Sequence, residues 1–124
     1  MIFDLHSHSA ASDGELQATD LIERARSNGV DCFSITDHDT VAGYAGIDRN
    51  AIAGLTLIHG IELSAQWNGR SIHVVGLNID PQAGELARAL EGQRNVRLER
   101  ARTIARRLRQ NNGRCTYPAS PAPR

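Results

Sequence analysis

Short apolar segments alternate with helix-like segments over the first 80 residues of the chain. Apolar and β-branched residues, bounded by turn residues, predict strands at residues 2–6, 30–36, 55–63 and 71–79. Apolar positions at helical spacing predict a helix from an N-cap at Thr19 to a stop at Gly29. A second helix is expected over residues 41–53. Strands that alternate with helices indicate an α/β fold with a largely parallel sheet.

The pattern changes after residue 81. Before that point, the residues Trp67-Asn68-Gly69-Arg70 predict a hairpin turn that leads into the last strand. Beyond it, apolar residues recur at helical spacing up to residue 110, with a break expected near Gly92. Three prolines and an Asn-Asn-Gly sequence then predict an irregular tail. We therefore divide the chain into residues 1–81, 82–110 and 111–124.

Charge follows the same division. Residues 1–80 carry eleven acids, four arginines and all five histidines, whereas residues 81–124 carry three acids and ten arginines, and the chain has no lysine. An acidic segment rich in histidine suits the binding of cations. The arginine-rich segment suits either a solvated helix face, the more common case, or contact with phosphates.

Length and composition exclude several classes of protein. The 124 residues make one domain but cannot close a full (β/α)₈ barrel of about 250 residues. No apolar run reaches the roughly 20 residues that span a membrane, and the start resembles no signal peptide. The two cysteines form no zinc pattern, so we expect a reduced, cytoplasmic chain without membrane partners. Aromatic residues, at 4%, are too few for stacking on single-stranded nucleic acid, and no stable DNA complex is expected.

Histidines and acids gather at the ends of the predicted strands. In an extended chain His6 and His8 point to the same face and can bind one ion. Because α/β sheets place their sites at the carboxyl ends of strands, six side chains are expected to converge: His6, His8, Asp13, His38, Glu62 and His73. Imidazoles and carboxylates without thiolates suit Zn²⁺, Mn²⁺ or Fe²⁺. Six donors indicate two or three ions, with Glu62 as a candidate bridge.

Each of these signals also has an ordinary structural explanation. A single histidine at a strand end is more often structural than a ligand, and we interpret His59, inside an apolar strand, as packed or solvent-facing. Cys32, also inside an apolar strand, is expected in the core. Four of the five histidines at successive strand ends nevertheless favour a metal site. Asp37, beside His38, is expected to hold a ligand in position.

Six motifs, in order and at matching spacing, resemble the polymerase and histidinol phosphatase (PHP) domain family. They are Asp4-Leu5-His6-Ser7-His8, Ser12-Asp13-Gly14, the helix end at 25–29, Ile35-Thr36-Asp37-His38-Asp39-Thr40, Gly60-Ile61-Glu62-Leu63-Ser64 and Ile72-His73-Val74-Val75-Gly76-Leu77. Trp67, before the last motif, makes the chain most similar to the stand-alone metal-dependent phosphoesterases, a branch that includes 3′,5′-nucleoside bisphosphate phosphatases and 5′→3′ exoribonucleases. The resemblance implies that residues 1–81 form part of a distorted (β/α)₇ barrel and that residues 82–110 begin a helical insertion.

The resemblance also implies a role for each residue of the site. His6 and His8 would hold a first ion, and Glu62 would bridge to a second ion at His73. Asp13 with His38 would hold a third ion, while Asp4, Asp37 and Asp39 would position the ligands. The implied activity is hydrolysis of phosphate esters by a metal-activated water. Its substrates would be small phosphoesters, nucleotides or short RNA.

The family pattern continues beyond the residues present in this chain. The remaining strands, a further metal-binding histidine and an Asp-x-His pair are not found after His73. The segment 111–124, rich in proline, alanine and arginine, is expected to be a truncated or out-of-frame end. The alternative function is therefore a non-catalytic remnant or a metal-binding module. An RNA-binding module built on the arginine-rich helix is less favoured, since no RRM, KH or OB motif is found.

Overall fold

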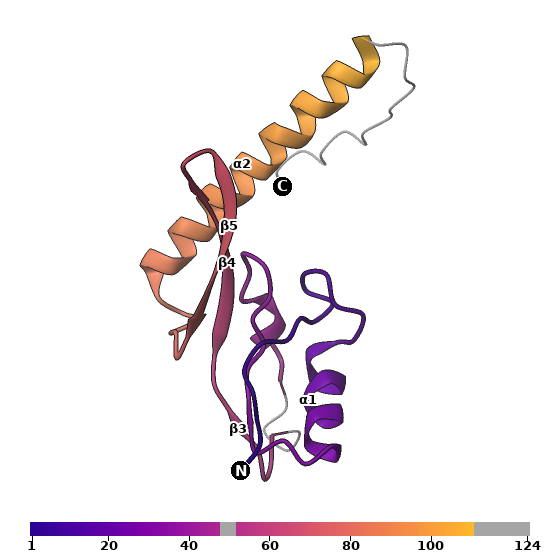
Figure 1. The fold of residues 1–124 in the computed structure, drawn as a ribbon, viewed down its shortest axis with the longest axis vertical. Coiled ribbons are helices and arrows are strands. Elements are labelled where there is room, and N and C mark those ends of the chain that lie inside the picture. Colours follow the sequence, from indigo (N-terminus) through magenta and orange to yellow (C-terminus); the bar gives the residue numbers. More distant parts are fainter. Residues whose placement is uncertain (48–51, 111–124) are drawn as a thin grey trace. The chain divides into compact units, whose positions relative to one another are not determined.

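The computed structural model describes residues 1–47 and 52–110. The chain divides into two compact units, residues 1–90 and 91–124, which are described separately. The elements of Figure 1 are β1 (Phe3–Asp4), α1 (Ala18–Ser27), β2 (Cys32–Phe33), the 3₁₀ helix η1 (Ala42–Tyr44), β3 (Thr56–Leu57), β4 (Gly60–Trp67), β5 (Arg70–Leu77) and α2 (Gly84–Gln110). The expected irregular tail at 111–124 lies outside the described residues.

Strands β1, β2 and β3 form a parallel sheet in that order. Phe3 lies opposite Cys32, which lies opposite Thr56. Between β1 and β2 the chain passes through α1, so this part of the molecule is the alternating, parallel arrangement that the sequence predicts. The α/β class is therefore confirmed, whereas closure of these strands into part of a barrel stays a proposal.

The hairpin of β4 and β5 is antiparallel, with Trp67 opposite Arg70. Asn68 and Gly69 form its two-residue turn with φ angles of 48° and 73°. Two positive φ angles are what a type I′ turn requires, and Asn-Gly meets that requirement at little cost. The predicted hairpin turn is confirmed.

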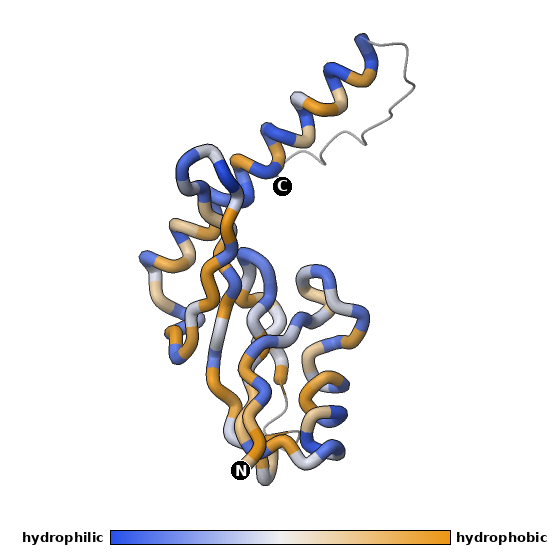
Figure 2. The backbone as a smooth tube through the Cα atoms, in the orientation of Figure 1, coloured by the Kyte–Doolittle hydropathy of each residue, from blue (hydrophilic) through white to orange (hydrophobic). Residues whose placement is uncertain are grey.

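The hydrophobic core of residues 1–90 lies between α1 and the parallel sheet. Helix α1 buries Ala18, Ile22 and Ala25, whose spacing places them on one face. They pack in one cluster with the buried side chains of Phe33 and Ile35. The alternation of apolar and polar colours along α1 in Figure 2 follows this division into a core face and a solvent face.

Helix α1 begins earlier than expected. Gln17, in an extended conformation, is its N-cap and makes no side-chain capping bond, so the prediction of Thr19 as N-cap is wrong. Ala18 is already helical because its burial contributes to the core. The other end is as predicted: the helix ends at Ser27, and Gly29 follows with a φ of 78°.

The helix expected over residues 41–53 is wrong for the residues that the structure describes there. Only the three residues of η1 are helical, and residues 48–51 lie outside the description. Gly43 is buried against Asp37, since a Cβ at Gly43 would lie 2.6 Å from Oδ2 of that residue. Tertiary contacts of this kind override the weak helical tendency of a segment with two glycines.

Two further boundaries differ from the sequence expectation. The strand expected over 55–63 is divided into β3 and the start of β4. Helix α2 runs through Gly92, so the predicted break there is wrong. One glycine costs about 1 kcal/mol in a helix interior, which strong helix formers on both sides offset.

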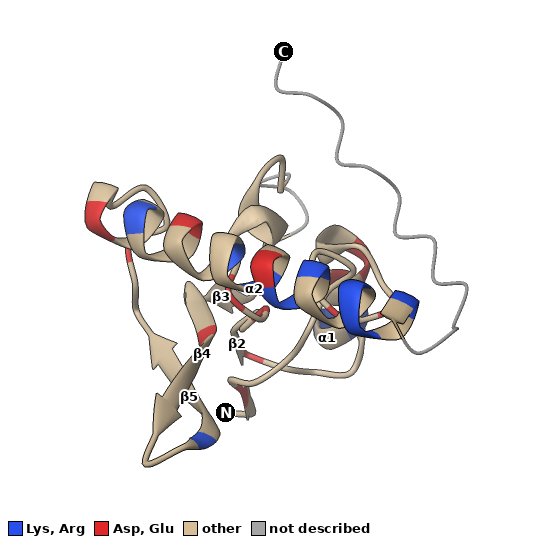
Figure 3. Ribbon diagram, turned by 90° about the horizontal axis from the view of Figure 1, so that it is seen from above, with Lys and Arg blue, Asp and Glu red and all other residues tan. Residues whose placement is uncertain are grey.

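Helix α2 carries most of the arginine residues, which Figure 3 shows concentrated towards its carboxyl end. Arg102 pairs with Glu99 at 2.5 Å, one turn earlier. Neither helix of the described part has the length and apolarity needed to cross a membrane.

Truncation of Ile22 tests the assignment of the core. Its side chain is fully buried, so Ile22→Ala is expected to lower the free energy of unfolding by about 2–5 kcal/mol. Val96→Ala, at a helix position that is 64% exposed, is the control and should change it by less than about 0.5 kcal/mol. Urea unfolding followed by circular dichroism measures both, and equal effects would contradict the assignment.

Candidate metal centre

The structure brings the six predicted site residues together. His6, His8 and Asp13 lie on the loop after β1, His38 follows β2, and Glu62 and His73 belong to β4 and β5. A parallel bridge between His38 and Glu62 joins the segment after β2 to β4. The segments after β1 and β2 thus meet the hairpin at one place. Glu62 lies near the start of β4, and His73 lies inside β5 and not at a strand end.

Glu62 lies at the centre of this cluster. Its Oε2 is 2.8 Å from Nε2 of His6 and 3.1 Å from Nε2 of His8, and its Oε1 is 2.9 Å from Nδ1 of His73. The carboxylate is buried, with a side-chain exposure of 8%. Both oxygens therefore face imidazole nitrogens, an arrangement that suits a bridging carboxylate.

Asp13, whose side chain is 65% exposed, contacts His8 and His38. Its Oδ1 is 3.2 Å from Nδ1 of His8, and its Oδ2 is 3.5 Å from Nε2 of His38. The four imidazole rings form a row, with ring centroids 5.2, 4.6 and 4.8 Å apart from His6 to His8, His38 and His73. Such close packing of imidazoles and carboxylates is unusual for a structural core and typical of a metal centre.

Three overlapping groups of donor atoms emerge, each with its atoms within 4.8 Å of one another. We name each after the residue that it alone contains: the His6 group (His6, His8, Glu62), the Asp13 group (His8, Asp13, His38) and the His73 group (His38, Glu62, His73). Because His8, His38 and Glu62 belong to two groups each, neighbouring ions could share ligands.

The donor set fits divalent ions chemically. Each group combines imidazole nitrogens with a carboxylate, which is the composition that Zn²⁺, Mn²⁺ and Fe²⁺ accept. Nδ1 of His38 is buried without a hydrogen-bond partner in the described part of the chain. A buried polar atom of this kind needs a partner, and a bound ion would provide one.

The electrostatics of the cluster keep Glu62 ionised. Burial by itself raises the pKa of the Glu62 carboxyl group. The hydrogen bond from His6 and the charges of the surrounding histidines lower this pKa, and together they outweigh the effect of burial. The net result is a pKa below the ordinary value of 4.5. The group is thus an anion, as a metal ligand must be.

The three aspartates expected to position ligands differ in their surroundings. Asp37 is buried and accepts hydrogen bonds from Ser9 and Ser12. Asp39 accepts one from the amide of Ser64 in β4. Asp4 is exposed, and its carbonyl oxygen accepts a bond from the amide of Ser34, so its role as a positioning residue stays a prediction.

Tyr44 is a structural residue of the site that sequence reasoning missed. Its hydroxyl donates to the carbonyl of Ile35 and accepts a 2.7 Å bond from the amide of Gly60, two residues before Glu62. Burial raises the pKa of this phenol. A tyrosine beside two glycines carries no sequence signal for this contact, because the partners are distant backbone groups.

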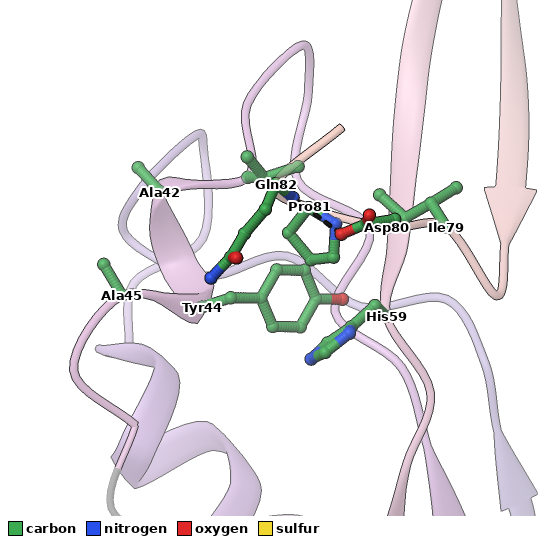
Figure 4. A pocket seen from close by; sticks show the side chains of 9 residues that line it. Ala42, Tyr44, Ala45, His59, Ile79, Asp80, Pro81 and Gln82 are labelled. Carbon is green, nitrogen blue, oxygen red and sulfur yellow. Dashed lines mark hydrogen bonds between the residues drawn. The ribbon is translucent and has the colours of Figure 1, made fainter. Parts of the chain in front are cut away.

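His59 lies in a separate pocket. Its ring meets the ring of Tyr44 edge-on at 4.6 Å, and Pro81 and Gln82 line the same pocket (Figure 4). It belongs to none of the three metal groups found among the described residues. The interpretation of His59 as a packed or solvent-facing residue is confirmed.

The parallel strands and the histidine–carboxylate cluster define an α/β protein with a candidate metal centre. The model of the PHP domain matches residues 4–83, and the chain belongs to the PHP domain family. It is 44% identical over 110 residues to a 5′-3′ exoribonuclease of Haemophilus influenzae, and the aligned region covers 86% of this chain and 39% of that protein. It is 41% identical over 106 residues to a 3′,5′-nucleoside bisphosphate phosphatase of Chromobacterium violaceum, and the aligned region covers 85% of this chain and 37% of that protein.

Solved structures give the same picture. An amidohydrolase of Chromobacterium violaceum, with bound sulfate and no metal, is similar with a TM-score of 0.74 and 37% identity, over 90% of this chain and 39% of that one. A Bifidobacterium adolescentis protein assigned as a metal-dependent phosphoesterase is similar with a TM-score of 0.75 and 33% sequence identity. The match covers 87% of this chain and 38% of that protein. The chain thus spans less than two fifths of the length of these relatives.

The pKa of Glu62 predicts a pH-dependent contribution to stability. Because the pKa is lower in the folded chain, ionised Glu62 stabilises the fold above the ordinary value of 4.5 and loses this effect as pH falls through the lower, folded value. In metal-free buffer, the difference in unfolding free energy between wild type and Glu62→Gln should therefore shrink as pH falls below 4.5. Urea unfolding at several pH values measures it.

The exposed Glu15 provides the control for this pH series. Glu15→Gln removes a carboxylate of the same kind away from the cluster and should leave the pH dependence of wild type in place. A Glu62→Gln effect that is constant across the pH range would contradict the electrostatic account.

Proposed function

We propose that the chain is the metal-binding part of a phosphoesterase that hydrolyses phosphate esters of nucleotides or short RNA. The observation that carries the proposal is the set of three overlapping groups of donor atoms around Glu62 and Asp13. Divalent ions held in such a set supply an activated water and neutralise phosphate charge.

The geometry supports a specific assignment of ligands. His6, His8 and Glu62 would hold a first ion, and Glu62 would share in holding a second ion with His73 and His38. Asp13 and His38 would hold a third ion together with His8. The site would hold two or three divalent ions. Mn²⁺, Zn²⁺ and Fe²⁺ are the candidates, since the donor set accepts each of these metals.

The substrate class follows from the relatives. One relative is named for nucleoside bisphosphates, and others are named as 5′-3′ exoribonucleases. Both kinds of substrate carry a phosphate ester on a nucleotide, which is the chemistry that a cluster of cations recognises. As part of the same proposal, residues 1–81 belong to a PHP barrel in the cytoplasm, and residues 82–110 to its helical insertion.

A second candidate is a chain that binds metal without turnover. Its motivation is that the three donor groups by themselves account for the binding of metal but not for turnover. The two candidates are separated by measuring bound metal and phosphate release on the same sample. Bound metal with no release from a nucleoside 3′,5′-bisphosphate would favour the second candidate.

Replacement of His6 tests the ligand assignment. His6→Ala should reduce Mn²⁺-dependent phosphate release from a nucleoside 3′,5′-bisphosphate by at least about 100-fold, because even partners behind a metal ligand matter by 10- to 100-fold. His59→Ala is the matched control, since this exposed histidine lies outside the three groups. Full activity in His6→Ala would refute the assignment.

A further inference from the structure

We infer that the two aspartates on either side of His38 position different metal groups. Asp37 positions the Asp13 group by holding the part of the loop from Ser9 to Ser12, and Asp39 positions the carboxylate that the His6 and His73 groups share by holding β4 next to Glu62. The inference rests on the proposed function, since it assumes that the three groups bind ions.

The carboxylate of Asp37 is the anchor of the loop that carries Asp13. Asp37 is 2% exposed, and its Oδ1 accepts bonds from the amide of Ser9 at 2.7 Å and the hydroxyl of Ser12 at 2.7 Å. Its Oδ2 accepts a third bond, from the hydroxyl of Ser9, at 2.6 Å. All three bonds go to the loop, and Asp13 is the residue directly after Ser12. The position of the Asp13 carboxylate therefore depends on Asp37.

The loop has little freedom beyond this anchor. The amides of Ser12 and Gly14 donate to the carbonyl of Ser9 at 3.1 and 2.9 Å, which closes the loop on itself. On the other side, a Cβ at Gly43 would lie 2.6 Å from Oδ2 of Asp37 and 3.0 Å from Oγ of Ser9. The close approach of η1 thus covers the anchor, so a loop released from Asp37 has no equivalent place to bind.

Asp39 faces a different element. Its Oδ1 accepts a 2.7 Å bond from the amide of Ser64, and its own amide donates to the carbonyl of Glu62 at 3.0 Å. The amide of Glu62 in turn donates to the carbonyl of Asp37 at 3.1 Å. These bonds fix the backbone on both sides of Glu62, and thereby the direction of the carboxylate that the His6 and His73 groups share.

The backbone conformation explains why the two carboxylates face apart. In an extended segment, residues two apart point to the same face. Asp39 instead has a φ of 50°, in the left-handed region, which turns the chain between His38 and the next residues. One short segment can therefore hold the loop through Asp37 and β4 through Asp39.

The division predicts separable effects on the protein without metal. Ser12→Ala removes one bond of the Asp37 anchor, together with the longer, 3.4 Å contact of the same hydroxyl with Asp13. It should increase hydrogen exchange in peptides covering residues 9–14, but not in those covering residues 61–66. Asp39→Gly permits the same φ but removes the carboxylate. It should increase hydrogen exchange in peptides covering residues 61–66, but not in those covering residues 9–14. Asp39→Asn, which tolerates this φ and retains an acceptor oxygen, should restore the exchange of wild type.

The same variants should separate the metal groups. In a Mn²⁺ titration followed by the electron paramagnetic resonance of free Mn²⁺, Ser12→Ala should weaken one ion by about 10- to 100-fold and leave the others at wild-type affinity. Asp37→Ala also releases Ser9, next to the shared ligand His8, and should weaken the ion of the Asp13 group by more than Ser12→Ala does. Asp39→Gly should weaken the ions that Glu62 binds. Asp80→Ala is the control, because it removes a carboxylate that holds the amide of Gln82, away from the cluster.

The outcomes distinguish this inference from the proposed function. Equal weakening of every ion by Ser12→Ala and Asp39→Gly, or increased exchange in both segments for either variant, would overturn the division. If wild type binds no Mn²⁺, the proposed function fails. The exchange experiment on the metal-free protein then still shows whether Asp37 and Asp39 position separate segments, and an unchanged loop in Ser12→Ala would overturn that part.

Discussion

The buried carboxylate of Glu62 is the constraint on which the rest of the site depends. A buried anion is unfavourable unless it is paired and hydrogen-bonded. Here His6, His8 and His73 approach its two oxygens at 2.8–3.1 Å, and they come from the loop after β1 and from β5. The need to compensate one charge thus holds separate elements at a common point, and the same contacts keep the pKa of Glu62 below its ordinary value.

Backbone hydrogen bonds on both sides of Glu62 also fix its position in the fold. The bridge to His38 sets the register of β4 against the segment after β2. Tyr44 binds the amide of Gly60, where a Cβ would lie 2.4 Å from Oγ of Ser34. Close approach of backbone to side chain leaves no alternative register, because a shift by one residue would turn Glu62 to the opposite face.

The sequence predicted those features that depend on local pattern. The Asn68-Gly69 turn needs only its two residues, and the convergence of the segments after β1 and β2 needs only the parallel order of these strands. His73 reaches the cluster from inside β5, not from a strand end. The helix expected over residues 41–53 is wrong for the described residues of that range, since contacts of Gly43 and Tyr44 with distant residues determine their conformation. The hydrogen bonds of Asp37 with Ser9 and Ser12 could not be predicted from the sequence either, because they depend on how the loop after β1 folds.

The segment Asp37-His38-Asp39 combines these constraints in three residues. Its central side chain is shared by the Asp13 and His73 groups, while its outer carboxylates bind the loop and β4. A positive φ at a residue other than glycine is unfavourable, least so for aspartate and asparagine, and it persists only where surrounding contacts require it. At Asp39 the bonds to Ser64 and Glu62 meet that requirement. The strained conformation is therefore the consequence of binding two different segments from positions two residues apart, which a regular strand would point to the same face.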